Sequence, residues 1–282
     1  MMRASIRPSF GNNRIQMMNR TRHILLWKVT CLFLLLSMLS GCRSLIDAPP
    51  PFPWHECYEP LESLAAEKFV SQALEKAVSI YGEPVVSVQS VLLRHSSKTH
   101  KVRNYRLAEN FNLTECLDPE KGLFAIYLAA EPDSEDFYPI LGHECFHLLN
   151  PYIFDWYMEG AATVFSEEFC RECGVSWAAW EKRFRREGKK KPYSASYWMM
   201  KELKQAVPGH YPQIIRYTAT SGKKDRLSID IDAWLDTLSE SERIRALNII
   251  SRWMKILKRR ESKVYHFTVP AELKRKEVSS CR

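Results

Sequence analysis

The segment ILGHECFHLL, residues 140–149, constrains the fold more than any other part of the chain. Glu144 is its single carboxylate, and it contains no lysine or arginine. His143 and His147 are four residues apart, so on a helix they project from the same face, one turn apart. A helix this apolar has to be buried, because apolar surface is driven out of contact with water. The rest of the chain must therefore supply its packing partners.

The neighbouring segments have the patterns of a single α+β domain. Residues 61–82 have apolar positions at helical spacing and end in glycine, which predicts a helix. Two segments rich in β-branched and aromatic residues, 85–95 and 121–130, predict strands. Further helices are expected over residues 138–149, with acidic capping residues at 133–136, and over 155–170, 194–207 and 242–260. We therefore expect a small sheet packed on the 138–149 helix, followed by a mainly helical C-terminal part.

The N-terminus has the features of a secretory signal. Residues 1–41 carry basic side chains but no acid, and an apolar run follows Lys28. The run ends in Leu39-Ser40-Gly41-Cys42, which resembles the bacterial lipobox. The resemblance implies that residues 1–41 are a lipoprotein signal peptide, cleaved before Cys42, and that Cys42 is lipidated. An uncleaved membrane anchor is the alternative, and in both cases the remainder of the chain lies outside the cytoplasm.

Residues 42–60 are interpreted as the lipidated cysteine and a proline-rich tether, and residues 61–282 as the folded domain. Proline-rich chain favours extended polyproline II over helix. Acyl chains on Cys42 would anchor the protein in a membrane, since several chains together bind firmly. Arg43 resembles an outer-membrane sorting signal. The expected location is the bacterial cell envelope, with the domain held at the outer membrane and facing the periplasm.

The distribution of charge excludes nucleic acid as a partner and leaves anionic lipid open as one. The basic residues of the N-terminal 41 positions account for most of the formal net charge of +8. The nearly neutral remainder gives no electrostatic basis for binding nucleic acid. The dense basic run EKRFRREGKKK, residues 181–191, is interpreted as a solvated connector between helices. Contact with anionic lipid is the alternative for this run.

The cysteines fit an oxidising compartment. Six remain outside the signal segment and Cys42, and they allow up to three disulfides. Cys145 lies in the apolar 140–149 segment, so we expect it to stay a reduced, buried thiol. Cys170 and Cys173 are expected to be bridged structurally or to be free thiols, because no second cysteine pair accompanies them as a metal motif would require.

The two histidines and the acid between them match a known pattern of metal chemistry. Side chains at the positions of His143 and His147 can both reach one tetrahedral Zn²⁺. Glu144 lies between them along the helix and can act on a water molecule at the metal, as the general base of an H-E-x-x-H site. The alternative is a pair of core helices in which both histidines make ordinary hydrogen bonds.

A second helix carries the candidate third ligand, Glu159. Asn150-Pro151 is expected to end the first helix and let the chain turn. The small residues 160–162 then let the Glu159 helix approach closely. The sequence WYMEGAA resembles the gluzincin metallopeptidases, in which H-E-x-x-H is followed by a helix with glutamate in a W-x-x-E-G-x-A context. The spacing between His147 and Glu159 is shorter than in thermolysin-like members.

That resemblance implies a zincin-like fold and a Zn²⁺ ion bound by His143, His147 and Glu159. Glu167 and Glu168 are alternative third ligands. In aminopeptidase-type gluzincins a tyrosine stabilises the oxyanion, which nominates Tyr193, with Tyr197 second. Packing at a helix start is the alternative role for Tyr193.

We therefore expect a lipid-anchored zinc metallopeptidase that hydrolyses a peptide or protein substrate. Two other classes of function remain open at this point. One is a non-catalytic binding or scaffold lipoprotein with the same fold. The presence of Glu144 argues against a non-catalytic protein, because loss of that base is the simplest route to an inactive enzyme. The other is a metal-dependent amidase acting on the cell wall, which the sequence does not distinguish from a peptidase.

Overall fold

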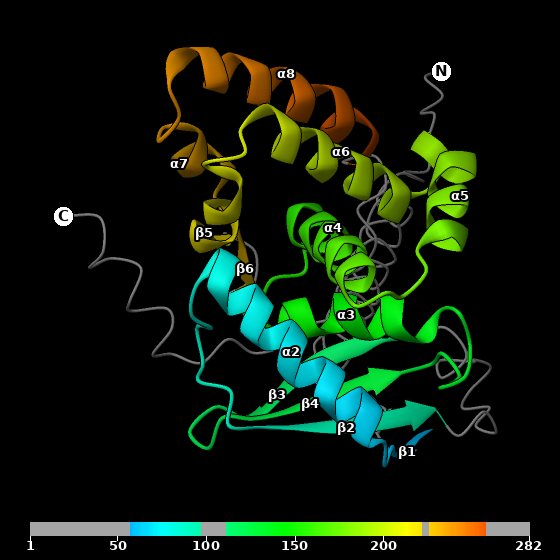
Figure 1. Cartoon of the computed structure of the whole chain (residues 1–282). Helices are drawn as coiled ribbons and strands as arrows, with labels where there is room; N and C mark the ends of the chain where they lie inside the picture. Colours follow the sequence, from blue (N-terminus) through cyan, green and yellow to red (C-terminus); the bar gives the residue numbers. More distant parts are fainter. Residues whose placement is uncertain (1–56, 97–110, 222–225, 258–282) are drawn as a thin grey trace, which may run out of the picture. The chain divides into compact units, whose positions relative to one another are not determined.

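A computed structural model describes residues 57–96, 111–221 and 226–257 of the chain. The expectations for the signal peptide, for Cys42 and for most of the tether lie outside these residues. The described part is a mixed α+β structure with one small sheet and a mainly helical remainder (Figure 1). Within it, none of the helices is both long and apolar enough to cross a membrane.

The sheet has four strands in the order β1-β2-β4-β3. Strand β4 is parallel to β2 and antiparallel to β3, and β1 is antiparallel to β2. Residues 124–128 of β4 are buried on both faces, as expected for a central strand, whereas β3 forms an edge of the sheet. The bounds are Tyr58–Pro60 for β1, Ser90–Ser96 for β2, Leu113–Asp118 for β3 and Leu123–Leu128 for β4.

Helix α3 (Phe137–His147) lies between the sheet and α4 (Trp156–Glu172), next to α2 (Leu64–Tyr81) (Figure 1). Its buried residues face partners on several sides, which is why its apolar residues do not form a single stripe. Ser63 caps α2, since its hydroxyl accepts a hydrogen bond from the backbone N–H of Ala66. This strongly apolar helix thus lies in the centre of the core of the described part.

The remaining elements extend the structure away from the sheet. Helix α6 packs on α4, and α8 packs on α6 (Figure 1). A separate hairpin, β5 and β6, bridges to the loop before α4 through Ile153 and Leu227. The bounds are Ala178–Glu187 for α5, Gly188–Lys190 for η3, Pro192–Ala206 for α6, Tyr211–Arg216 for η4, Thr218–Ser221 for β5, Arg226–Ile229 for β6, Ile231–Leu235 for α7 and Glu240–Leu257 for α8.

The five predicted helices are confirmed to within a few residues, and so is the α+β class, but the segment 181–191, interpreted as a connector, mostly belongs to helix α5 and to η3. One strand prediction was too long. The segment 85–95 is strand only from Ser90, because the backbone N–H groups of Val85 and Gln89 donate to the loop carbonyls of Leu149 and Gly122 instead of to a neighbouring strand. The cap predicted for α3 was also wrong. Asp136 makes no side-chain capping bond there and pairs with Arg183 of α5.

Cys145 is the thiol that was expected, but no disulfide joins Cys116, Cys170 and Cys173 to one another, although at least one disulfide was expected among the remaining cysteines. Cys145 is fully buried in the core and is not in a disulfide. Cys170 lies in the last turns of α4 and Cys173 directly follows that helix, and they are not bridged to each other. Burial raises the pKa of the Cys145 thiol well above its usual range, so this thiol stays protonated and unreactive.

Candidate metal centre

Three side chains from two neighbouring helices converge on one point. His143 and His147 project from the same face of α3, and their Nε2 atoms are 3.3 Å apart. Glu159, in the first turn of α4, places Oε2 3.3 Å from Nε2 of His143 and Oε1 3.8 Å from Nε2 of His147. These three residues form a group that could hold a metal ion.

The spacing of the donor atoms fits a small tetrahedral ion. Zinc bonds of about 2.0–2.1 Å place neighbouring ligand atoms of a tetrahedron about 3.3–3.4 Å apart. Two of the three distances in the site, between His143 and each of the other ligands, equal 3.3 Å. The donor set of two imidazoles and a carboxylate is also one that zinc accepts while keeping a fourth position open.

The loop before α4 sets the position of Glu159. Asp155 caps α4, since its Oδ1 accepts hydrogen bonds from the backbone N–H groups of Tyr157 and Met158. The other carboxylate oxygen of Asp155 accepts from the N–H of Ile229 in β6, at 2.6 Å. One buried carboxylate therefore starts the helix and ties it to the β5–β6 hairpin. Burial raises the pKa of Asp155, and these three backbone donors oppose the rise.

Glycine at position 160 allows α6 to approach the ligand helix. A Cβ at Gly160 would clash with the carbonyl oxygen of Ser196 and with the side chain of Met200, both on α6. The close contact of α4 with α6 next to Glu159 therefore requires a residue without a side chain. The sequence pattern of small residues after Glu159 indicated such an approach, and the structure shows that the partner is α6.

A single hydroxyl, that of Thr163, links two of the candidate ligands. Thr163 Oγ1 donates to the backbone carbonyl of Glu159 at 2.8 Å and lies 3.1 Å from Nδ1 of His143. Because its one proton is already donated, Thr163 accepts a hydrogen bond from Nδ1–H of His143. That tautomer leaves Nε2 of His143 with its lone pair directed at the centre, as a metal ligand requires. Nδ1 of His147 is buried with no hydrogen-bond partner among the described residues.

The pKa shifts of His147 and Glu159 also suit a metal, whereas the shift of His143 favours a proton that a metal ion would have to displace. Burial, together with the nearby His143, lowers the pKa of His147 to about 4, so His147 is neutral and can bind through nitrogen. Burial opposes charge on His143 as well, but the hydrogen bond and the charge of Glu159 outweigh it and raise the pKa of His143. Burial alone would raise the pKa of Glu159, whereas the hydrogen bond from His143 and both histidine charges hold it below its usual value.

Glu144 borders this group without belonging to it. It is buried, and burial raises its pKa to about 7, with the charge of Glu159 adding to the rise. Thr114 of the edge strand β3 holds it in place. The Thr114 hydroxyl lies 2.7 Å from the backbone carbonyl of Glu144 and 3.0 Å from its Oε2. A carboxyl group in this environment is suited to exchanging protons near neutral pH.

Tyr193, in the first turn of α6, lies at the same centre. Its ring is 6.5 Å from the ring of His143 and packs edge-on against Trp156 at 5.6 Å. A hydrogen bond from its hydroxyl helps to lower the pKa of Glu159. Tyr193 itself is 52% exposed, whereas the side chains of His143 and Glu159 keep only 16% and 12% of their surface accessible.

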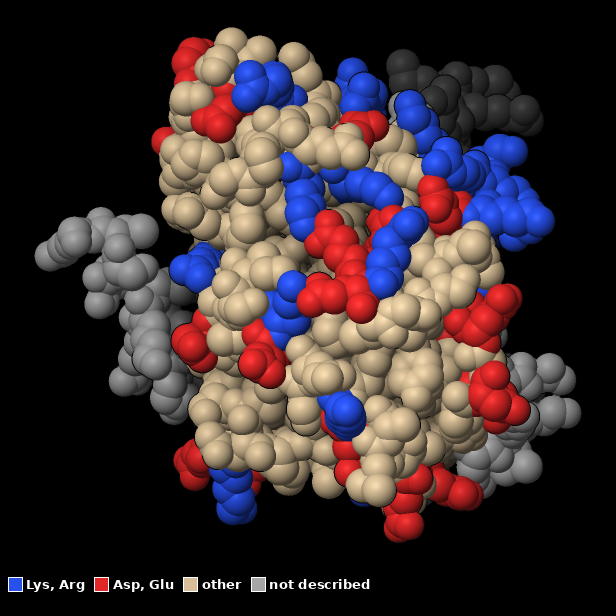
Figure 2. Space-filling view, in the orientation of Figure 1, with Lys and Arg blue, Asp and Glu red and all other residues tan. Residues whose placement is uncertain are grey.

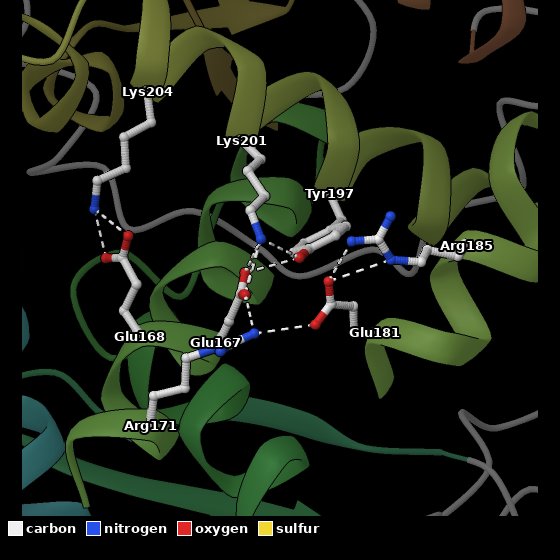
Figure 3. Close-up of polar contacts among 8 residues, drawn as sticks. All are labelled: Glu167, Glu168, Arg171, Glu181, Arg185, Tyr197, Lys201 and Lys204. Atoms are coloured by element: carbon white, nitrogen blue, oxygen red, sulfur yellow. Dashed lines mark hydrogen bonds and ion pairs between the residues drawn. The ribbon is translucent and has the colours of Figure 1, made fainter. Parts of the chain in front are cut away.

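The alternative ligands and the second tyrosine lie elsewhere (Figure 3). Tyr197 is fully buried and donates its hydroxyl to Oε2 of Glu167 at 2.7 Å. Glu167 also accepts from Lys201, at 2.8 Å, and pairs with Arg171. Glu168 pairs with Lys204 of α6. Each of these carboxylates is already neutralised by a cation, so neither is part of the candidate centre.

Two residues at the centre, Thr114 and Thr163, were missed by the sequence reasoning. Thr163 follows Glu159 by four residues, so helical spacing could have placed it on the same face. Nothing near Thr114 in the sequence indicates its contact with Glu144.

Comparisons of the chain with models of protein families, with curated proteins and with solved structures found no match. Its function is therefore inferred from the residues of this centre.

Proposed function

We propose that this protein is a zinc-dependent peptidase with a zincin-like fold. The observation that carries the proposal is the convergence of His143, His147 and Glu159 at tetrahedral spacing, with Glu144 beside them and outside the ligand set. A bound zinc ion would lower the pKa of a water molecule and polarise the carbonyl group of a substrate.

The protein's own residues then divide the proton transfer and the charge stabilisation between them. Glu144 accepts a proton from the attacking water and delivers it to the nitrogen of the leaving amine. The hydroxyl of Thr114, 3.0 Å from Oε2 of Glu144, restricts the orientation of that carboxylate. Tyr193 is exposed and donates through a hydroxyl that can turn from Glu159 to a substrate carbonyl, where negative charge develops.

We further propose that the domain is held at the bacterial cell envelope by a lipid on Cys42. The support for this part is the Leu39-Ser40-Gly41-Cys42 sequence after the apolar run. A protein anchored in this way would act on peptides or proteins outside the cytoplasm. Anchoring and catalysis do not depend on each other, so each is tested by its own experiment.

The decisive experiment measures zinc and cleavage together. Wild-type protein and Glu144→Gln are purified, their metal content is determined by mass spectrometry, and each is incubated with a peptide library. We expect one zinc per chain in both and cleavage by the wild type. The rate of Glu144→Gln should be lower by roughly 10²–10⁴-fold, the usual loss when a general base is removed.

Other outcomes separate the alternatives. Zinc bound without any cleavage would indicate a binding or scaffold protein. Cleavage of cell-wall muropeptides but not of proteins would indicate an amidase. Folded wild-type protein that binds no zinc would contradict the metalloenzyme proposal.

A further inference from the structure

Exposed basic residues gather on one segment of the surface, over α5, η3 and the start of α6. This basic patch consists of Lys182, Arg186, Lys189, Lys190 and Lys191, all of which are exposed. Among the described residues, none of the five has a partner in an ion pair. Lys189 lies over the ring of Trp253, 5.1 Å from its centroid, which holds its charge without neutralising it. Figure 2 shows this concentration of Lys and Arg at the upper right, where Figure 1 places α5.

The cations around the basic patch are, by contrast, paired. Arg183 bonds Asp136, and Arg185 bonds Glu181, which also receives Arg171. On the facing helices, Lys201 and Lys204 are bonded to glutamates of α4 (Figure 3). The acids of these pairs are therefore occupied by other cations, and Glu187, within the segment itself, is a single acid among the five cations of the basic patch. The basic patch keeps its positive charge, whereas the adjoining surface is close to neutral.

The basic patch runs into the candidate metal centre. Lys191 is the N-cap residue of α6, and Tyr193 follows two positions later. Since consecutive Cα atoms are 3.8 Å apart, the Cα atoms of Lys191 and Tyr193 are at most about 7.6 Å apart. The exposed Tyr193 in turn has its ring 6.5 Å from that of His143 and forms a hydrogen bond with Glu159. A chain reaching the centre past Tyr193 therefore passes within reach of lysine side chains.

We propose that the basic patch binds acidic peptide, so that the protein selects substrates with Asp or Glu residues near the bond to be cleaved. Each exposed ion pair contributes little, about 0.2–1 kcal/mol, but several like charges together attract a polyanion and steer it to a neighbouring site. The continuity with Tyr193 favours a substrate over a membrane surface as the partner. The selection of substrates rests on the proposed peptidase function, whereas the binding itself does not.

Binding is tested on the full-length chain in detergent, with zinc bound and with Glu144→Gln to prevent cleavage. The probe is a fluorescent peptide rich in glutamate, compared by anisotropy with a peptide that has glutamine at the same positions. We expect the acidic peptide to bind more tightly, and the difference to shrink as salt is added. In the double variant Lys190→Glu/Lys191→Glu, affinity for the acidic peptide should fall on the order of tenfold at low salt.

Lys68→Glu is the control for reversing one exposed charge elsewhere on the surface, since Lys68 is an exposed lysine of α2 without an ion pair in the described part. It should bind the acidic peptide as the parent protein does. Equal binding of the two peptides, or an equal loss in Lys68→Glu, would overturn the proposal. A result with vesicles would also overturn it. In that result the protein prefers phosphatidylglycerol to phosphatidylcholine vesicles, the double variant loses this preference, and the two peptides bind equally. Tight binding of the acidic peptide with no cleavage by zinc-loaded wild type would contradict the peptidase function and leave the binding site intact.

Discussion

Thr163 and His143 are joined by a hydrogen bond of 3.1 Å between the two helices that carry the candidate metal ligands. The same Thr163 hydroxyl donates to the carbonyl of Glu159, one turn earlier on α4. The orientation of a ligand on α3 and the backbone of a ligand on α4 therefore depend on one oxygen atom. Partners of this kind fix the tautomer of a ligating histidine and strengthen its bond to the metal.

Replacing Thr163 by valine keeps the shape of the side chain and removes this hydrogen bond. We expect zinc affinity to fall by about 10–100-fold, the usual effect of losing such a partner, while the fold is retained. Thr163→Ser keeps the hydroxyl and should stay close to wild type. Competition with a zinc chelator measures the affinities. Equal affinity of the valine and serine variants would contradict a role for the hydrogen bond.

Thr114 is expected to act on the rate and not on the metal. Thr114→Val removes the hydroxyl that lies 3.0 Å from Oε2 of Glu144, so the carboxylate loses its fixed orientation. We expect kcat to fall by about tenfold, a fraction of what losing the base itself costs, with KM, zinc content and Tm nearly unchanged. Thr114→Ser should restore the rate. If KM rises instead and kcat is unaffected, Thr114 contributes to substrate binding and not to the action of the base.

Glu159→Ala should lose zinc, because two histidines alone leave the ion with too few protein ligands. His147→Ala should behave in the same way. Glu168→Ala is the control, since this carboxylate pairs with Lys204 and is not part of the centre. Metal analysis of the three purified variants decides the matter. Full zinc content in Glu159→Ala, together with loss of zinc in Glu168→Ala, would show that the third ligand lies farther along α4.

Glu167 should matter for stability and not for metal binding. Its side chain is 6% exposed and neutralises Lys201, so Glu167→Ala leaves a partly buried cation and the hydroxyl of Tyr197 without their acceptor. Breaking a buried pair on one side costs about 3–5 kcal/mol of unfolding free energy. Glu168→Ala, at a 43% exposed side chain, should cost about 1 kcal/mol or less. Chemical unfolding measures both, and a similar cost for the two variants would contradict the assignment.

Lipidation is tested at Cys42. Labelling with palmitate in a bacterial host should mark the wild-type protein and not Cys42→Ala, because acylation requires the cysteine thiol. The apparent mass and the membrane fraction of the two proteins should differ accordingly. Equal labelling would show that the Leu39-Ser40-Gly41-Cys42 sequence is not used as a lipobox.

Much of this structure was predictable because it depends on neighbours in the sequence. Helical spacing alone brings His143 and His147 to one face. The ends of helices depend on local capping and on proline, so α2 and α4 begin within three residues of the predicted positions 61 and 155. Glu159 was nominated by its resemblance to a known pattern, and the structure brings it next to both histidines.

The chain's fold decided what sequence spacing leaves open. Strand β3 lies beside α3, so Thr114 meets Glu144 across 30 positions of sequence. The packing of α6 on α4 separates two tyrosines on the same helix. Tyr193 reaches the centre and Tyr197 turns to Glu167.

By itself, then, the sequence determined the candidate metal-binding pair on α3, the α+β class and the acid proposed as base. Only the tertiary structure decided which side chains surround them and which cations on the surface stay unpaired. The physical reason is the range of the forces involved. Helix formation and capping act over a few residues, whereas hydrogen bonds and ion pairs between elements exist only once apolar burial has brought distant segments together.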